Sequence, residues 1–403
     1  RLSISPSVTK VYAIPGSAAM SDCAELVGID WQQSDHLISF LKENQVDLVV
    51  VGPEAPLVAG LADVLNKAGI PVFGPSKAAA QLEGSKVFAK DLMKKYNIPT
   101  AAYGVFHKVD EAKAFIAQTG APIVVKADGL AAGKGVVVAM TIDEANVAVE
   151  DMLSGNRFGD AGSTVVIEEF MEGEEASLLA FVDGKTVVPM IASQDHKRIF
   201  DGDKGPNTGG MGTYAPAPVL TDALRDEAMK TILEPMVAAM EKEGMPYVGC
   251  LYAGLMITDE GPKVVEFNAR FGDPETQVVL PLLDSDLGEI MMACAKGTLT
   301  SNMVKWKDSS AACVILASKG YPETSSKGDV ISGDIKQYDT TIVFHSGTKL
   351  VGENYVTNGG RVLGVVGLGK DLRTALDRAY ERIEHIDFEG MQYRTDIGAK
   401  AFK

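Results

Sequence analysis

The chain of 403 residues is too long for one simple hydrophobic core, so two to four domains are expected. Its 38 Lys and Arg residues against 54 Asp and Glu residues leave a net charge of −16, which argues against nucleic acid or an anionic membrane as the main partner. Four widely separated cysteines, with no long apolar segment and no signal peptide, argue against a disulfide framework, a cysteine zinc site and a membrane span, and they indicate a cytoplasmic protein.

The first hundred residues alternate short apolar strands with helical patterns, and a long helical pattern, 77–96, follows them. Such β-α-β alternation indicates a parallel sheet covered by helices, and we assign residues 1–102 to an N-terminal α/β domain. Ligands of such sheets bind beyond the carboxyl ends of the strands, which makes Gly52–Glu54 a candidate rim, although a plain turn explains these residues equally well. Because the strand and glycine-rich turn that usually open such a domain are absent, we expect it to be truncated.

Residues 103–171 have the pattern of a small α+β subdomain with a glycine-rich loop, Ala127–Gly135, at its tip. Glycines let backbone N–H groups approach phosphate oxygens, although a surface hairpin gives the same pattern and the Walker A spacing is absent. An unpaired ammonium at the end of an apolar strand is costly, so we expect an anion opposite Lys126. The loop residues that are candidates for phosphate contact are Gly133, Lys134 and Gly135.

The segment after the last strand of this subdomain is a candidate nucleotide contact. Glu168, Phe170 and Met171 can offer backbone groups to the edge of a base. Glu175 can accept hydrogen bonds from ribose hydroxyls. Acidic residues that follow a strand are also commonly solvated, and this alternative stays open.

A strand that ends at Asn268 carries a candidate metal site. Glu266 and Asn268 lie two residues apart, so they share one face of the strand. Carboxylate and amide oxygens suit Mg²⁺ when phosphate oxygens complete its shell. Arg270 continues the same face if the strand persists, and Asp273 and Glu275 follow at the turn. A solvated strand end is the alternative.

Polar residues 193–198, followed by the glycine-dense loop 205–212, resemble a substrate pocket within a large subdomain that we assign to residues 172–303. Cations there suit a carboxylate or phosphate, and the loop supplies backbone donors. A lone histidine such as His196 is either a general base or an ordinary structural residue. The candidate residues are Asp195, His196, Lys197, Arg198, Asn207, Thr208, Gly209, Gly210 and Met211.

The last hundred residues, 304–403, have the pattern of a separate, mainly β domain with one helix near its end. Lys349 and Arg361 each lie beside glycines near strand ends. The two cations can hold a phosphate group jointly, whereas solvated surface charge explains either one alone.

Together these motifs resemble the ATP-grasp superfamily and, within it, the glycinamide ribonucleotide synthetase family. The resemblance runs from about residue 8 to the end of the chain. SQDHKR and GPNTGGMG distinguish this family from relatives such as biotin carboxylase. The motifs that carry it are VVGPEAPL (50–57), FGPSKAAAQLEGSK (73–86), IVVKADGLAAGKGV (123–136), SQDHKR (193–198), GPNTGGMG (205–212), LYAGLM (251–256), EFNARFGDPETQ (266–277), FHSGTK (344–349) and TNGGRV (357–362).

The resemblance implies a ligase of purine biosynthesis that joins glycine to 5-phosphoribosylamine while ATP becomes ADP and phosphate, through a glycyl phosphate. ATP would be held by Lys86, Lys126, the glycine-rich loop, Glu168, Phe170, Met171 and Glu175. Mg²⁺ or Mn²⁺ would be bound by Glu266 and Asn268, and Arg270 would stabilise the transferring phosphoryl group. Glycine and phosphoribosylamine would be bound by residues 195–198, 207–211, Asp273 and Glu275, with Lys349 and Arg361 at the sugar phosphate.

Two other readings remain open, namely another ATP-grasp carboxylate–amine ligase and an ATP-binding protein without activity. Family members begin with a strand and a G-x-G-G-R-E-H turn that helps to bind phosphoribosylamine, and this sequence lacks both. We expect a monomer or weak dimer.

Overall fold

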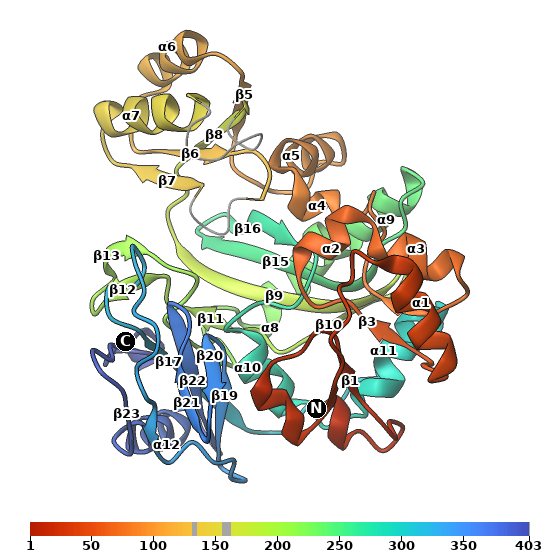
Figure 1. Cartoon of the computed structure of the whole chain (residues 1–403). Helices are drawn as coiled ribbons and strands as arrows, with labels where there is room; N and C mark the ends of the chain where they lie inside the picture. The colour runs from red at the N-terminus through yellow and green to blue at the C-terminus, as the bar shows by residue number, and fades with distance from the viewer. Residues whose placement is uncertain (131–134, 155–162, 403) are drawn as a thin grey trace.

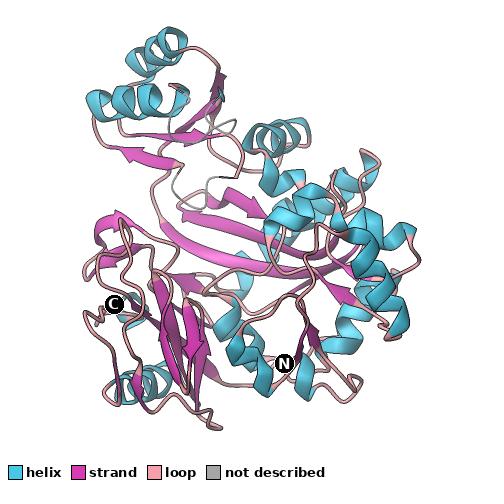
Figure 2. Cartoon of the chain, in the orientation of Figure 1, coloured by secondary structure: helices cyan, strands magenta, loops and turns pink. Residues whose placement is uncertain are grey.

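The computed structural model describes residues 1–130, 135–154 and 163–402. Figure 1 shows a small subdomain that stands over the long strands of a large sheet, with helices of the N-terminal part on one side and a C-terminal domain on the other. Figure 2 shows helices and strands mixed in every part of the chain, as the α/β and α+β prediction requires. Among the described residues, no helix combines the length and apolar character needed to cross a bilayer.

The N-terminal part contains two pairs of short parallel strands, β1 with β2 and β3 with β4, which confirms the predicted parallel pairing. The helix expected over 77–96 is divided, because the Ser85 side chain accepts a hydrogen bond from the Phe88 amide and begins a new helix there. The elements are β1 (Tyr12–Ala13), β2 (Glu25–Leu26), α1 (Ser34–Glu43), β3 (Val49–Val50), α2 (Glu54–Ala59), α3 (Leu61–Lys67), β4 (Val72–Phe73), α4 (Gln81–Gly84) and α5 (Lys86–Lys95).

The small subdomain is a four-stranded antiparallel sheet in the order β5-β8-β6-β7. Val125 and Ile167 face a core shared with helices α6 and α7. Because side chains alternate along a strand, Lys126 and Glu168 lie on the opposite face. The elements are β5 (Tyr103–Phe106), α6 (Val109–Thr119), β6 (Ile123–Ala127), β7 (Val136–Ala139), α7 (Ile142–Leu153) and β8 (Val165–Glu169).

The large sheet has the order β10-β9-β15-β16 and consists of two antiparallel hairpins, β9 with β10 and β15 with β16, joined side by side. One face packs in a core with the N-terminal helices, and the other face packs on α11. The elements are β9 (Glu174–Asp183), β10 (Val187–Pro189), α8 (Asp222–Ala228), the π-helix η4 (Met229–Leu233), α9 (Glu234–Lys242), β15 (Val248–Thr258), β16 (Gly261–Asn268), α10 (Thr276–Val279) and α11 (Leu287–Lys296).

The C-terminal domain contains a five-stranded sheet in the order β11-β14-β17-β22-β19. Two of its strands, β11 and β14, come from the segment that the sequence analysis placed in the large subdomain, so the candidate substrate loop is attached to the C-terminal sheet. The elements are β11 (Gln194–Asp195), β12 (Arg198–Phe200), β13 (Lys204–Asn207), β14 (Gly212–Ala215), β17 (Ser310–Ala317), β18 (Ser332–Gly333), β19 (Thr341–His345), β20 (Thr348–Val351), β21 (Asn354–Thr357), β22 (Arg361–Gly369), α12 (Leu372–Ile383) and β23 (Ile386–Asp387). Short 3₁₀ turns are η1 (Leu2–Ile4), η2 (Ala18–Asp22), η5 (Leu280–Leu282), η6 (Ser301–Met303) and η7 (Ala399–Phe402).

Candidate active site

A cleft of about 1080 Å³ lies where the small subdomain, the large sheet, the N-terminal part and the substrate loop meet. The N-terminal rim Gly52–Glu54 lines it, as expected from its place at the end of β3. The predicted site residues that line the cleft are Lys86, Lys126, Gly135, Glu168, Phe170, Met171, Glu175, Asp195, Lys197, Arg198, Asn207, Thr208, Gly209, Glu266, Asn268, Arg270, Asp273, Glu275 and Arg361.

Four described residues that were predicted for the site do not line the cleft. The Met211 side chain is fully buried against Ile199 and Ala317. Gly210 has a φ of +115°, and its backbone lies so close to the Asp195 and Pro274 side chains that a larger residue would not fit. Lys349 is exposed on β20. The His196 side chain is buried between the Gly212 carbonyl and the Gly398 amide. Gly133 and Lys134 lie outside the described residues.

Both ring nitrogens of His196 are engaged by the backbone, which favours the structural alternative for this residue over a general base. Nδ1 lies 3.1 Å from the Gly212 carbonyl, to which it must donate, and Nε2 accepts from the Gly398 amide at 3.3 Å. The ring is 2% exposed. Burial, followed by the charge of Arg394, lowers the pKa of His196 to about 4, so the ring is neutral at pH 7.

The anion expected opposite Lys126 is a protein carboxylate. Glu168 lies 3.0 Å from the Lys126 ammonium and 2.9 Å from that of Lys90, and all three side chains are at most 5% exposed. The Glu168 carboxylate is therefore paired with two lysines, and the contact of its backbone groups with a base stays a prediction. Burial lowers the pKa of Lys90 to about 8, although Glu168 opposes the shift.

Lys90 is a site residue that the sequence analysis missed. The signal was its position on α5 one turn after Lys86, because residues four apart share one helix face. Both lysines line the cleft. Lys86 donates to the Gly129 carbonyl at 3.0 Å, and the Asp128 carboxylate accepts from the Lys86 amide at 2.6 Å. The start of the glycine-rich loop is thus fixed to the N-terminus of α5.

Glu266 and Asn268 share one face of β16 and both line the cleft, while Phe267 between them is buried in the core. Burial alone would raise the pKa of Glu266, but the ammonium groups of Lys197, Lys126 and Lys86 and a hydrogen bond from Asn268 lower it. Within the described parts of the chain, no group of three or more His, Cys, Asp or Glu side chains is placed to hold a metal ion. A metal at this pair would therefore take further ligands from a bound substrate.

Arg270 lies beyond the end of β16, so it is not a continuation of the metal-pair face. Its guanidinium lies 2.9 Å from the Glu83 carboxylate and 3.3 Å from that of Glu54. These two acids, and the amide of Ala269 bonded to Glu83 at 2.7 Å, join the end of the strand to the N-terminal part. Arg270 still lines the cleft, but its charge is already paired.

Another part of the cleft lining contains acidic side chains close to the Lys197 ammonium group. Glu175, predicted for ribose, lies 3.4 Å from the Lys197 ammonium and is the largest cause that raises the pKa of this lysine. Burial, and next the charge of Glu275, raises the pKa of Asp195 well above its ordinary value. Glu275 accepts a hydrogen bond from the Tyr252 hydroxyl at 2.7 Å.

Arg361 is the member of the predicted phosphate pair that reaches the cleft. It donates to the Gly209 and Asp273 carbonyls at 2.8 and 2.9 Å and pairs with the Asp273 carboxylate at 3.1 Å. It therefore joins the substrate loop to the turn after β16. Lys349 does not share this position.

Comparison with known proteins gives consistent matches along the chain. The chain matches the phosphoribosylglycinamide synthetase N domain over residues 1–83, the ATP-grasp (A) domain over 84–276 and the C domain over 311–400. It is 53% identical over 397 residues to the phosphoribosylamine–glycine ligase of Halalkalibacterium halodurans, covering 98% of this chain and 92% of that protein. It is 52% identical to the ligase of Neisseria meningitidis serogroup A, covering 100% of this chain and 95% of that protein.

Solved structures agree with these matches. The crystal structure of phosphoribosylamine–glycine ligase from Thermotoga maritima has a TM-score of 0.86 and 33% identity, covering 98% of this chain and 96% of that chain. A biotin carboxylase from Campylobacter jejuni has a TM-score of 0.73 at 16% identity, covering 95% of this chain and 87% of that chain, which shows a shared fold.

Proposed function

The chain belongs to the phosphoribosylglycinamide synthetase family, and we propose on that basis that it is a phosphoribosylamine–glycine ligase. A glycine carboxylate oxygen attacks the γ-phosphorus of ATP, the bond to ADP breaks, and glycyl phosphate forms. The amine of 5-phosphoribosylamine then attacks the acyl carbon, phosphate leaves, the amine loses a proton and glycinamide ribonucleotide results. The observation that carries this proposal is the convergence of three lysines on Glu266 in one cleft.

ATP is proposed to lie between the small subdomain and the large sheet. Lys86 and Lys126 supply positive charge for the phosphates, and phosphoryl transfer depends mainly on such charge and on in-line placement. Lys126 is held in place because it donates to the Val265 carbonyl at 3.0 Å and is paired with Glu168. Phe170 and Met171 line the cleft where the chain leaves β8, so we assign the base to them.

A divalent cation, which we propose to be Mg²⁺ or Mn²⁺, fits Glu266 and Asn268 once polyphosphate is bound. Before polyphosphate binds, the nearby lysines repel a cation, and Glu266 and Asn268 supply one side-chain ligand each. The ion supplies Lewis-acid neutralisation of phosphate charge. This charge balance favours binding of the nucleotide and the metal ion together.

Glycine and phosphoribosylamine are assigned to the wall formed by the substrate loop. Lys197 suits the glycine carboxylate, and the acidic residues Asp195 and Glu275 suit its ammonium group. Arg198 and Arg361, with the backbone of 207–209, suit the sugar phosphate. Arg270 can contact the transferring phosphoryl group when its pairing with Glu54 and Glu83 loosens, and in the present geometry it positions the end of β16.

The test is phosphate release from ATP with each substrate omitted in turn. We expect release only when ATP, Mg²⁺, glycine and freshly prepared phosphoribosylamine are all present, with glycinamide ribonucleotide formed in equal amount. Release with bicarbonate in place of glycine and phosphoribosylamine would identify a carboxylase-like enzyme. Sustained release without the amine substrate would overturn the proposal.

A further inference from the structure

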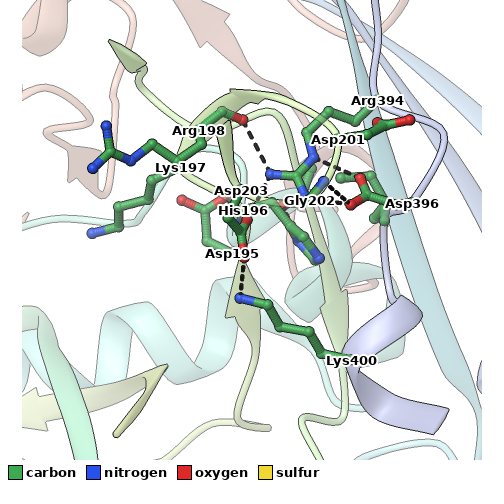
Figure 3. A network of polar contacts seen from close by, with 12 residues as sticks. Asp195, His196, Lys197, Arg198, Asp201, Gly202, Asp203, Arg394, Asp396 and Lys400 are labelled. Atoms are coloured by element: carbon green, nitrogen blue, oxygen red, sulfur yellow. Dashed lines mark hydrogen bonds and ion pairs between the residues drawn. The ribbon is translucent and has the colours of Figure 1, made fainter. Parts of the chain in front are cut away.

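The C-terminal segment 394–400 lies along the hairpin of β12 and β13, almost two hundred residues away in the sequence (Figure 3). The hairpin is small, with three- and four-residue strands and an irregular register between Arg198 and Phe200. A two-stranded ribbon of this size is marginal by itself, so its position depends on what it packs against.

Arg394 is the centre of this contact. Its side chain is 1% exposed, although a guanidinium is costly to bury without partners. It is held by both carboxylate oxygens of Asp396, at 2.7 and 2.8 Å. Its remaining terminal nitrogen donates to the Asp203 carboxylate at 2.8 Å and to the Arg198 carbonyl at 3.1 Å. One buried charge therefore links strand β12 and the turn of the hairpin to the C-terminal segment.

Other residues of the C-terminal segment make further contacts with the hairpin and with the residues just before it. Asp396 accepts from the Gly202 amide at 2.8 Å, and the Gly398 amide donates to His196. Lys400 pairs with Asp203 at 2.6 Å (Figure 3). The hairpin is thus held at its tip and at its base by the C-terminal segment.

The hairpin and the residue before it also contribute side chains to the cleft. Lys197 immediately precedes β12, and its carbonyl accepts from the Thr208 amide at 2.7 Å and from the Thr208 hydroxyl at 2.8 Å. Arg198 and Asn207 pair across the hairpin and both line the cleft. A shift of the hairpin would therefore move Lys197, Arg198 and the 207–209 backbone together.

We propose that Arg394 is a positioning residue for the glycine and phosphoribosylamine side of the cleft, acting through Asp203 and the Arg198 carbonyl. The inference rests on the proposed function. Lys86 and Lys126 belong to other elements and donate to the Gly129 and Val265 carbonyls, far from the hairpin in sequence, so the ATP side should be affected much less. Misplacement of substrate contacts by about 1 Å can lower kcat/KM by as much as 10²-fold.

The experiment compares Arg394→Met, Arg394→Lys and Arg382→Met in the full chain. Arg382 is a matched control because it is also buried in this domain, pairs with Asp334 and donates to the Lys336 carbonyl, yet these partners lie outside the hairpin. The measurements are thermal unfolding and the KM of each substrate. Activity of the unaltered chain with all three substrates is established first, so that a failure of the proposed function is recognised separately.

We expect both methionine variants to unfold at lower temperature, but only Arg394→Met to raise the KM for glycine and phosphoribosylamine, by about tenfold or more, with the KM for ATP changed less than threefold. Arg394→Lys should restore part of the loss. If Arg394→Met does not fold, Asp396→Asn serves instead, since Asp396 does not line the cleft, and we expect a smaller change in the same direction. Unchanged KM values, or the same KM change in Arg382→Met, would overturn the proposal.

Discussion

Replacing Glu168 by Gln tests whether one buried carboxylate holds the two lysines of the small subdomain. The change keeps the shape of the side chain and removes its charge. Lys90 and Lys126, at 2.9 and 3.0 Å from Glu168, would then face each other without a counter-ion in a region where their side chains are at most 5% exposed. Removing one partner from a buried ion pair costs about 3–5 kcal/mol.

The structure allows this magnitude to be bounded. The pKa of Lys90 is already about 8 with Glu168 beside it, so loss of that charge should lead Lys90 to release its proton near pH 7. Deprotonation limits the penalty, and we therefore expect the lower part of the range, about 3 kcal/mol. Lys126 retains the Val265 carbonyl at 3.0 Å, which limits its displacement.

Hydrogen exchange of the β6 and β8 amides measures the effect locally. A loss of about 3 kcal/mol corresponds to a fall in protection of about 10²-fold in these strands. Glu169→Gln is the matched control, because this neighbouring carboxylate is exposed and its substitution should change stability by less than about 0.5 kcal/mol. A change below about 1 kcal/mol in Glu168→Gln would refute the assignment of Glu168 as the counter-ion of both lysines.

Three further predictions follow from the site. Glu266→Gln should lower Mg²⁺-dependent turnover by about 10²-fold or more while thermal unfolding changes little, and unchanged turnover at saturating Mg²⁺ would remove Glu266 from the metal site. The folded-state pKa of His196 is about 4, below its ordinary value of 6.5, so between these pH values the unfolded chain binds the proton more readily than the folded chain. Protonation of His196 should therefore lower the free energy of unfolding by up to about 3 kcal/mol as pH falls from 6.5 to 4, as measured by urea unfolding. The same pH dependence of stability in His196→Gln would contradict this. Arg361→Ala should raise the KM for phosphoribosylamine about tenfold or more, whereas Lys349→Ala should leave this KM within twofold of that of the unaltered chain. Equal effects of the two substitutions would show that a position in the cleft does not distinguish Arg361 from Lys349 in binding the substrate.

Much of the fold followed from periodicity. Alternation along β16 correctly placed Glu266 and Asn268 on one face, and alternation along β6 placed Lys126 away from the subdomain core. The helix near the end of the last domain, α12, also followed from its local pattern. These features depend on residues close in sequence, where side-chain direction is fixed by the backbone itself.

The partners of the charged residues did not follow in the same way. The sequence shows that Arg270 and His196 lie in polar surroundings, but not that Glu83 binds the first or that Gly398 binds the second. Lys349 has the same local pattern as Arg361, and only the packing decides which of them enters the cleft.

The sequence by itself therefore determined the order of the elements, the family resemblance and the faces on which polar groups lie. Tertiary structure alone decided which charges remain available to a substrate and which are neutralised within the protein, as Arg394 shows by its contacts with Arg198 and Asp203. The physical reason is that local periodicity fixes the direction of a side chain, whereas its counter-ion is supplied by a segment brought close only when the chain folds.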